Sequence, residues 1–141
     1  MPPLLPRKGI LAIAAVIDIA VHARNRPVAA KSLANRHRLP PRHLEPVLQA
    51  LVRQGILKGV RGPRGGYELG REARRITADD ILRAAGSAED GETAPPTKSA
   101  VLTHVVMPAL ARAETAFSTA LGHINLHDLV SASEGIRRPA E

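Results

Sequence analysis

The sequence contains no cysteine and no tryptophan, and it has one phenylalanine and one tyrosine among 141 residues. Without cysteine, disulfides, thiol nucleophiles, thiolate zinc sites and cysteine-ligated iron–sulfur clusters are excluded. Any metal site would have to use His, Asp or Glu. Because aromatics are so scarce, the 44% hydrophobic content is mainly Ala, Leu, Val and Ile, which suits close-packed helices better than an all-β fold.

Long hydrophobic runs are also absent. The longest run, residues 10–17, ends at Asp18 and is far short of the roughly 20 residues that a membrane span needs. Arg7 and Lys8 precede it, but no small-residue cleavage site follows at signal-peptide distance. We therefore expect a cytoplasmic protein with no membrane partner, and the length allows one compact domain with an appendage.

Charge is distributed unevenly along the chain. Residues 1–75 hold 15 Lys and Arg against 4 Asp and Glu, a net charge of +11, whereas residues 76–141 hold 5 against 9, a net charge of −4. A basic half of this density is typical of polyanion binding, and the acidic, Ala-rich half suits a protein or ligand contact. Charge alone does not distinguish DNA from RNA or a membrane surface.

The first half has the periodicity of a helix-turn-helix. Apolar residues recur at helical spacing over residues 9–23, with Asp18 and His22 off the apolar stripe. A short helix is predicted over residues 28–35 and a turn over residues 36–40. Pro41 suits the first position of the next helix, and Gly55 is a natural C-terminal stop. Two helices around a short turn form a helix-turn-helix.

A β-hairpin is predicted directly after these helices. Two short strands, residues 56–60 and 67–69, flank a tip rich in glycine, with one proline, at residues 61–66. The tip lacks the Lys-Ser/Thr pair of a phosphate-binding P-loop. Thr77 and Asp80 then resemble a capping box for a fourth helix, which ends at Gly86. Helix-turn-helix followed by hairpin is the layout of a winged helix.

The C-terminal part is predicted to hold a long dimerisation helix. Residues 87–99 lack periodicity and are expected to form a mobile loop. From Ala100 an apolar stripe spans about six helical turns, too long for this chain to cover alone, so a partner subunit should cover it. Pro108 predicts a kink near Val105. The expected interface residues are Leu102, Val106, Leu110, Ala113, Phe117 and Leu121.

A short closing helix over residues 125–130, capped by Asn125, and a frayed tail complete the expected organisation. The predicted fold class is mainly α: a winged helix-turn-helix domain with a small β-hairpin wing and a long C-terminal dimerisation helix. The boundaries are 1–86 for the DNA-binding domain, 87–99 for the loop, 100–131 for the dimerisation helix and closing helix, and 132–141 for the tail.

The segments that resemble a known family lie mostly in and around the hairpin. The strongest is Val-Arg-Gly-Pro-Arg-Gly-Gly-Tyr-Glu-Leu at residues 60–69, supported by residues 44–45, 55–57, 76–77, 80–82 and 126–129. Over residues 7–131 the chain resembles the Rrf-type winged-helix transcription factors, which include the iron–sulfur cluster regulator and the nitrite-sensitive repressor. The resemblance implies a homodimeric repressor on a pseudo-palindromic operator in double-stranded DNA.

The chain departs from this family in two ways. Cluster-binding members carry three cysteines in the loop that corresponds to residues 87–99, and this sequence has none, so no cofactor is expected. Pro46 stands where many members have a polar residue, so base readout by a side chain at that position is lost. Pro46 also removes the backbone hydrogen bond to the carbonyl near Arg42.

Three groups of basic and polar residues are expected to contact DNA. Arg42, His43 and Glu45 occupy the first turns of the predicted recognition helix, although Glu45 could equally pair with a neighbouring Arg instead of cytosine N4. Arg61 and Arg64 at the hairpin tip suit a narrow minor groove, with a flexible charged loop as the alternative. Phosphate contacts are expected from Arg7, Lys8, Lys31, Arg36 and Arg38.

Three of the histidines could have a functional role. His123 and His127 are four residues apart, but a helix that starts after Asn125 would leave His123 outside it, so no metal site is expected. His104 could sense pH or bind a ligand, although a structural role is commoner for such a histidine. No catalytic motif is present, and no enzyme activity is expected. The alternatives are a module responding to an unknown protein or metabolite effector, with DNA binding secondary, and a sequence-independent nucleoid protein.

Overall fold

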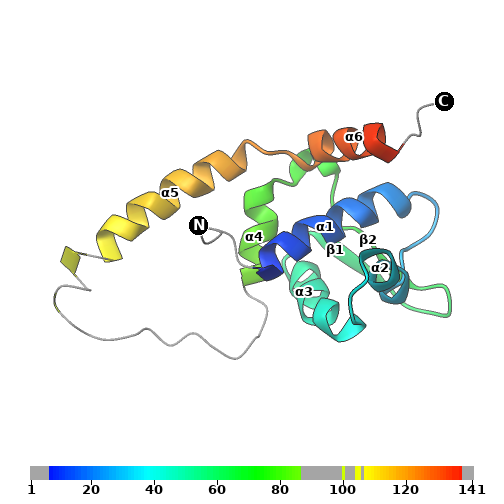
Figure 1. The fold of residues 1–141 in the computed structure, drawn as a ribbon. Coiled ribbons are helices and arrows are strands. Elements are labelled where there is room, and N and C mark those ends of the chain that lie inside the picture. Colours follow the sequence, from blue (N-terminus) through cyan, green and yellow to red (C-terminus); the bar gives the residue numbers. More distant parts are fainter. Residues whose placement is uncertain (1–6, 87–99, 101–103, 106, 138–141) are drawn as a thin grey trace.

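The computed structural model describes residues 7–86, 100, 104–105 and 107–137. Its helices and strands are, in chain order, α1 (Arg7–His22), α2 (Ala30–His37), α3 (Pro41–Arg53), β1 (Leu57–Val60), β2 (Gly66–Leu69), the 3₁₀ turn η1 (Ala73–Arg75), α4 (Ala78–Gly86), α5 (Met107–Gly122) and α6 (Leu126–Arg137). Figure 1 shows α1 to α4 and the hairpin gathered into one body, with α5 projecting from it. The predicted class, mainly α with a winged helix-turn-helix, is confirmed.

Helix α1 lies at the centre of the core. Ala12, Ala15, Val16 and Ile19 repeat at helical spacing and are fully buried, and α1 packs against α4, α3, α6 and β2. Burial of these side chains is the main favourable contribution to folding, at about 25 cal/mol per Å² of apolar surface. No helix in the described part of the chain is long and apolar enough to cross a membrane.

Helix α2 begins later than predicted, at Ala30 instead of Val28. Val28 is extended and pairs with Tyr67 of the hairpin, since each backbone N–H donates to the other's carbonyl at 2.9 and 2.8 Å. The helix ends at His37. The next residue, Arg38, has left-handed backbone angles (φ 55°), and its N–H donates to the carbonyls of Ala34 and Asn35. Val28 thereby fastens the hairpin to the segment that leads into α2.

Helix α3 begins and ends at the predicted signals. Pro41 occupies its first turn, and Leu44, Val47, Leu48 and Leu51 form its buried face. At its C-terminus Gly55 adopts φ 79°, and the N–H groups of Gly55 and Ile56 donate to the carbonyls of Val52 and Leu51, both at 3.0 Å. This is a Schellman motif, which requires a residue that tolerates positive φ.

The predicted hairpin is confirmed, as strands β1 and β2 pair antiparallel with Leu57 opposite Leu69 and Val60 opposite Gly66. Gly66 allows a close approach, because a Cβ there would lie 2.3 Å from the carbonyl oxygen of Val28. The capping box of α4 is also confirmed: the Asp80 N–H donates to Thr77 Oγ1 at 3.1 Å, and the Thr77 N–H donates to the Asp80 carboxylate at 3.0 Å.

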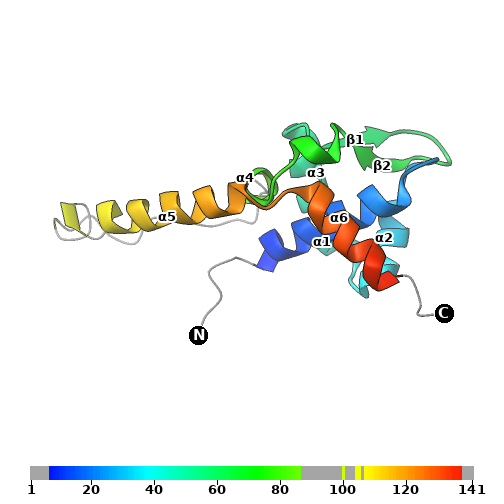
Figure 2. The same cartoon turned by 90° about the horizontal axis from the view of Figure 1, so that it is seen from above.

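Helix α5 points away from the body in both views (Figures 1 and 2). Its bounds are Met107–Gly122, and Ala100, where the sequence predicts the start of the helix, is also helical. Pro108 is the second residue of α5. His104 and Val105 adopt the wider π-helical geometry just before it, at the place where the sequence predicts a kink.

Helix α6 returns across α1 (Figure 2). Its start is held by backbone bonds from Leu126 to Ile76 and from Ala78 to Ile124, both at 2.9 Å. The predicted cap is confirmed, since the His127 N–H donates to Asn125 Oδ1 at 2.8 Å. The helix continues to Arg137, beyond the predicted end near Val130, because Val130 packs on the core and Glu134 forms an ion pair with Arg24.

Candidate nucleic-acid interface

Helix α3 presents a polar face opposite its buried one. Arg42, His43 and Glu45 are exposed in the first two turns, and Gln49 and Arg53 continue the exposed face one and two turns later. The side chains predicted to read bases are therefore free of the core and lie on one short helix. No ion pair of Glu45 is found among the described residues.

Pro46 lies inside α3 and is also exposed. It has no N–H to donate to the Arg42 carbonyl, yet the helix runs unbroken to Arg53 because its apolar face is anchored in the core. In the middle of the exposed face the helix thus offers an apolar ring without any hydrogen-bonding group. Side-chain hydrogen bonds from this face of α3 can come only from the positions on either side of Pro46.

The hairpin tip carries two exposed cations, Arg61 and Arg64. The tip is a compact turn in which the Gly65 N–H donates to the Gly62 carbonyl at 2.9 Å. Its base is fastened to Val28 by the two backbone bonds described above. These backbone contacts therefore hold the chain segment that carries Arg61 and Arg64 beside the start of α2.

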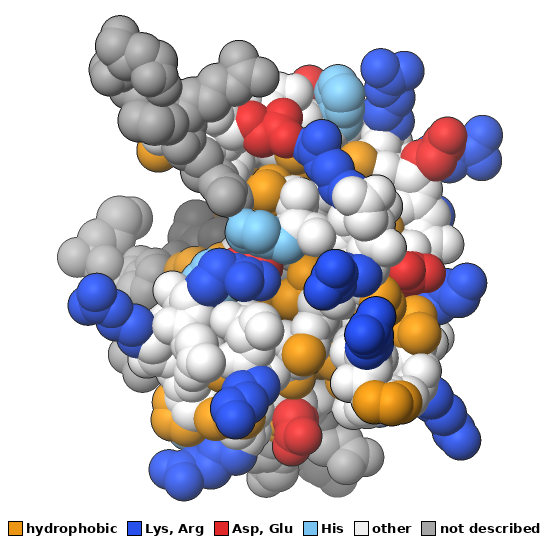
Figure 3. Space-filling model, turned by 90° about the vertical axis from the view of Figure 1, so that its right-hand side faces the viewer, with side chains coloured by type: hydrophobic (Ala, Val, Ile, Leu, Met, Phe, Trp, Pro, Cys, Tyr) orange, Lys and Arg blue, Asp and Glu red, His pale blue; other side chains and the backbone are white. Residues whose placement is uncertain are grey.

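A hollow of about 320 Å³ separates the hairpin tip from the start of α2. Its polar lining comes from His22, Arg26, Ser32, Arg36 and Arg64. Lys31 lies exposed in the adjoining first turn of α2. Figure 3 looks onto this end of the molecule and shows Lys and Arg side chains spread over it, with fewer acidic ones. Arg26 and Ser32 were not predicted as site residues, because only the folded hairpin brings them beside Arg64.

The predicted DNA-contacting cations differ in whether they have an acidic partner. Several arginines and one lysine elsewhere are paired: Arg24 with Glu134, Lys58 with Glu68, Arg75 with Glu72 and Arg83 with Asp79. Within the described residues, no acidic group lies within 4.0 Å of the cations at five predicted DNA-contacting positions, namely Lys31, Arg38, Arg42, Arg61 and Arg64. Five cationic heads are therefore available to phosphates.

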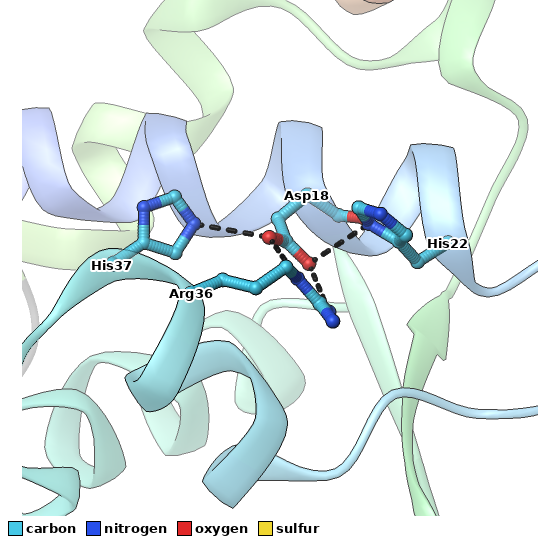
Figure 4. A network of polar contacts seen from close by, with 4 residues as sticks. All are labelled: Asp18, His22, Arg36 and His37. Carbon is cyan, nitrogen blue, oxygen red and sulfur yellow. Dashed lines mark hydrogen bonds and ion pairs between the residues drawn. The ribbon is translucent and has the colours of Figure 1, made fainter. Parts of the chain in front are cut away.

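Arg36 is the exception among the predicted phosphate contacts (Figure 4). Its Nε and Nη2 donate to the two carboxylate oxygens of Asp18 at 2.8 and 2.7 Å. His37 Nε2 lies 3.1 Å from the same carboxylate, and His22 Nδ1 lies 3.3 Å from it. The structure thus places Arg36 in an internal network that joins α1 to α2.

Asp18 is the one charged side chain found buried among the described residues, with 6% of its surface exposed. Its position off the apolar stripe did not predict this. Burial raises the pKa of the Asp18 carboxyl, but the hydrogen bond and charge of Arg36, with His22 and His37, outweigh it, so the pKa lies below its usual value. The hydrogen bond to Asp18 in turn raises the pKa of Arg36.

The remaining predicted residues fall into three groups. Lys8 lies in the first turn of α1 and is half-buried, and the side chain of Arg7 lies outside the described part. Among the interface residues, Leu102 and Val106 and the side chain of Leu110 lie outside it too, while Ala113 is exposed and Phe117 half-buried. The prediction that Leu121 is buried only between subunits is wrong. It is 8% exposed within one chain, in the last turns of α5, which packs against α4.

No group of three or more His, Asp or Glu among the described residues is placed to hold a metal ion. His127 lies in α6, and His123 precedes it in the connection from α5. The pair is thus divided between a helix and a turn, as the position of Asn125 predicts.

Comparisons with known proteins agree on one family. The chain is 33% identical over 135 residues to the HTH-type transcriptional regulator IscR of Xenorhabdus nematophila, which covers 92% of this chain and 80% of that protein. It is 31% identical over 135 residues, with the same shares covered, to a putative HTH-type transcriptional regulator of Azotobacter vinelandii.

Two solved structures have the same fold. IscR of T. potens superposes with a TM-score of 0.74 at 28% identity, covering 100% of this chain and 96% of the other. CymR, the global cysteine regulator of B. subtilis, superposes with a TM-score of 0.69 at 27% identity, covering 94% and 98%.

The sequence profile of the Rrf2 family, described as iron-dependent transcriptional regulators, matches residues 5–132. The residues present do not fit an iron site, because the sequence has no cysteine and the described His, Asp and Glu form no ligand group. On the match over almost the whole chain, and on the shared fold, this protein belongs to the Rrf2 family of transcriptional regulators.

Proposed function

We propose that this regulator binds a pseudo-palindromic operator as a homodimer and represses transcription from it. Helix α3 lies in the major groove, where Arg42, His43 and Glu45 face base edges. The hairpin tip reaches the adjacent minor groove with Arg61 and Arg64. The proposal is carried by the exposed cations on α3, the start of α2 and the hairpin tip, which have no acidic partner among the described residues.

The proposed DNA contacts are of two kinds: contacts to phosphates, which position the protein, and contacts that read the base sequence. Lys31 lies in the first turn of α2 and Arg38 follows its last residue, and both face phosphates and set the register without reading sequence. Arg26 and Ser32 belong with them, since the hollow that they share with Arg64 offers guanidinium and hydroxyl donors to a phosphate oxygen. The first two turns of α3 read the base sequence directly, and the hairpin tip reads it indirectly through the width of the minor groove.

The dimer rests on α5. This helix leaves the body of the molecule, and apart from its last turns its side chains stay largely exposed, with Val105 just before it 62% exposed. An exposed apolar stripe on a projecting helix is covered most simply by the same helix of a second copy. Two α3 helices then lie about one DNA turn or slightly more apart, as half-sites require.

The experiment is an unbiased DNA selection, followed by fluorescence anisotropy on the selected duplex and on a scrambled duplex of equal length. The proposal predicts an inverted repeat bound at least about a thousandfold more tightly than the scrambled duplex. Equal affinity for both would support a sequence-independent nucleoid protein, and no binding to either would favour a module for a protein partner.

A matched pair of variants tests the dimer in the same assay. Phe117→Asp places a charge in the proposed seam, where an unpaired charge is costly. Thr119→Asp places the same charge on an exposed side of α5 that borders a hollow beside α4. Sedimentation should show a monomer that has lost operator binding for Phe117→Asp and an active dimer for Thr119→Asp. An active, dimeric Phe117→Asp protein would place the interface elsewhere.

A further inference from the structure

Helices α1, α2 and α6 surround a pocket of about 500 Å³, a size within the range of small-molecule sites. One wall is apolar and comes from α1 and α6. The other end is polar and contains the Asp18 network together with Ser133. The lining residues are Ala14, Ile17, Asp18, Val21, His22, Arg36, His37, Ser133 and Ile136.

The polar end of the pocket offers donors more than acceptors. Both carboxylate oxygens of Asp18 already accept hydrogen bonds from Arg36, and His37 lies within bonding distance of one of them. A guanidinium has five N–H groups, of which these bonds use two, so Arg36 keeps donors for a further acceptor. Asp18 is the one acidic residue of the lining, and Arg36 pairs with it. A ligand that carries an acceptor with a negative charge fits this end.

The apolar wall of the pocket favours a ligand whose remaining part is hydrocarbon. Ile17 and Val21 of α1 and Ile136 of α6 stand beside the network. Ile136 is 85% exposed, so its side chain has apolar surface left for a ligand to cover. A hydrocarbon body placed between these side chains would bury apolar surface while its charged end meets Arg36.

The pocket shares a wall with the proposed DNA interface. His22 and Arg36 line both this pocket and the hollow between α2 and the hairpin tip. The only contacts between α1 and α2 with charge on both sides run through Asp18, among the described residues (Figure 4). A ligand that accepts hydrogen bonds from Arg36 therefore acts on the contact that joins α2 to α1.

We propose that this pocket binds a small carboxylate with an apolar body, and that its binding changes operator affinity through the Asp18–Arg36 contact. The carboxylate accepts hydrogen bonds from the remaining N–H groups of Arg36 and from Ser133. The body lies along Ile17, Val21 and Ile136. The binding step stands by itself, whereas the effect on DNA rests on the proposed function.

Binding is tested on the full chain without DNA, with butanoate, hexanoate and hexanol as probes. Calorimetry measures affinity, and methyl NMR follows Ile17 and Ile136. Hexanoate should bind about tenfold more tightly than butanoate, because it buries two more methylene groups. It should also bind at least tenfold more tightly than hexanol, and the two isoleucine methyls should shift. No hexanoate binding, or equal binding of hexanol, would overturn the proposal.

Matched variants locate the site. Ser133→Phe fills the pocket, whereas Ser131→Phe makes the same change at an exposed position on the same helix. Ile136→Asp places a repelling carboxylate at the rim, and Ile10→Asp is its control on an exposed isoleucine of α1 outside the lining. Both pocket variants should lose hexanoate binding at least tenfold and both controls should keep it. Wild-type affinity in Ser133→Phe and Ile136→Asp would overturn the location.

The coupling is measured last, as operator affinity with and without saturating hexanoate. We expect a change of at least fivefold in the wild type, within the usual range of coupling between sites, and none in Ser133→Phe. An operator affinity that hexanoate leaves unchanged would overturn the coupling. A protein that binds hexanoate but no DNA at all would instead contradict the proposed function, so the two failures are distinguishable.

Discussion

Two regions of this molecule use the same kinds of side chain in opposite ways. On α3 and the hairpin tip, Arg42, Arg61 and Arg64 stand exposed, without acidic neighbours within reach among the described residues. Between α1 and α2, Arg36 is bound through two hydrogen bonds to the buried Asp18. The residues in both regions are arginines, and the regions differ in whether the arginine has an acidic partner.

Whether a cation has an internal acidic partner indicates its role, which the number of charged residues alone does not. A cation already neutralised by an internal carboxylate releases few counterions when DNA arrives, whereas an unpaired cation releases them and gains affinity. We therefore expect Asp18 and Arg36 to stabilise the helix-turn-helix, and we propose that Lys31, Arg38, Arg42, Arg61 and Arg64 contact DNA. Substitutions in the two regions should affect different measurements.

The largest expected effect is on stability, from Asp18→Asn. The carboxylate is almost fully buried and accepts both bonds from Arg36. Its replacement leaves the partners without a counter-charge and should lower the free energy of unfolding by about 2–3 kcal/mol. This is the low end for a broken buried pair, because Arg36 is partly solvated. Urea unfolding measures it, with Glu45→Gln on the exposed face of α3 as a control expected to change stability by less than about 0.5 kcal/mol.

Measuring stability as a function of pH tests the contribution of the Asp18 ion pair. The pKa of Asp18 is lower in the folded protein than in the unfolded chain, so its carboxylate stabilises the fold fully above the unfolded pKa, and this contribution falls as pH drops through the folded pKa. The stability gap between wild type and Asp18→Asn should stay constant from neutral pH down to about pH 5 and shrink below about pH 4. A gap that widens on acidification would contradict the ion pair.

The next effect is on sequence-specific affinity. Arg64→Ala removes a cation from the hairpin tip and should weaken the selected operator more than a random duplex. Arg42→Ala should cost about 1–3 kcal/mol at one operator position. The control is Arg75→Ala, because Arg75 is exposed but lies beside Glu72. If both DNA-facing variants weaken all duplexes equally, neither element reads sequence.

The smallest effect is expected from Lys31→Ala in the first turn of α2. Loss of one phosphate contact should weaken operator and random duplex alike and lower the slope of log affinity against log salt by about one. The measurement is a salt titration of both duplexes by anisotropy. A loss confined to the operator would make Lys31 a reader instead of a positioning residue.

Local signals explain why much of the fold was predictable. Gly55 after an amphipathic helix, Thr77 with Asp80, and Asn125 before an apolar segment each act within a few residues. Their hydrogen bonds need no knowledge of the rest of the molecule. The hairpin belongs to the same class, since its glycine-rich tip and flanking strands are contiguous.

The parts that were missed depend on residues distant in the sequence. Val28 is extended because it meets Tyr67, and Asp18 is buried because Arg36 and His37 arrive on another helix. The periodicity of apolar residues predicts which face of a helix a residue occupies, but it does not predict which residue from elsewhere in the chain packs against that face. Leu121 and the second half of α6 were misjudged for the same reason, since both are covered by elements from elsewhere in the chain.

The most direct test of the contrast between paired and unpaired cations is the salt slope of Arg36→Ala, compared with that of Lys31→Ala on the same operator. Both variants lose one positive charge from α2, and only Arg36 is neutralised inside the protein. The account predicts that Arg36→Ala keeps the wild-type slope and loses stability, while Lys31→Ala lowers the slope by about one and keeps stability. A slope lowered by about one in Arg36→Ala, with stability unchanged, would contradict it.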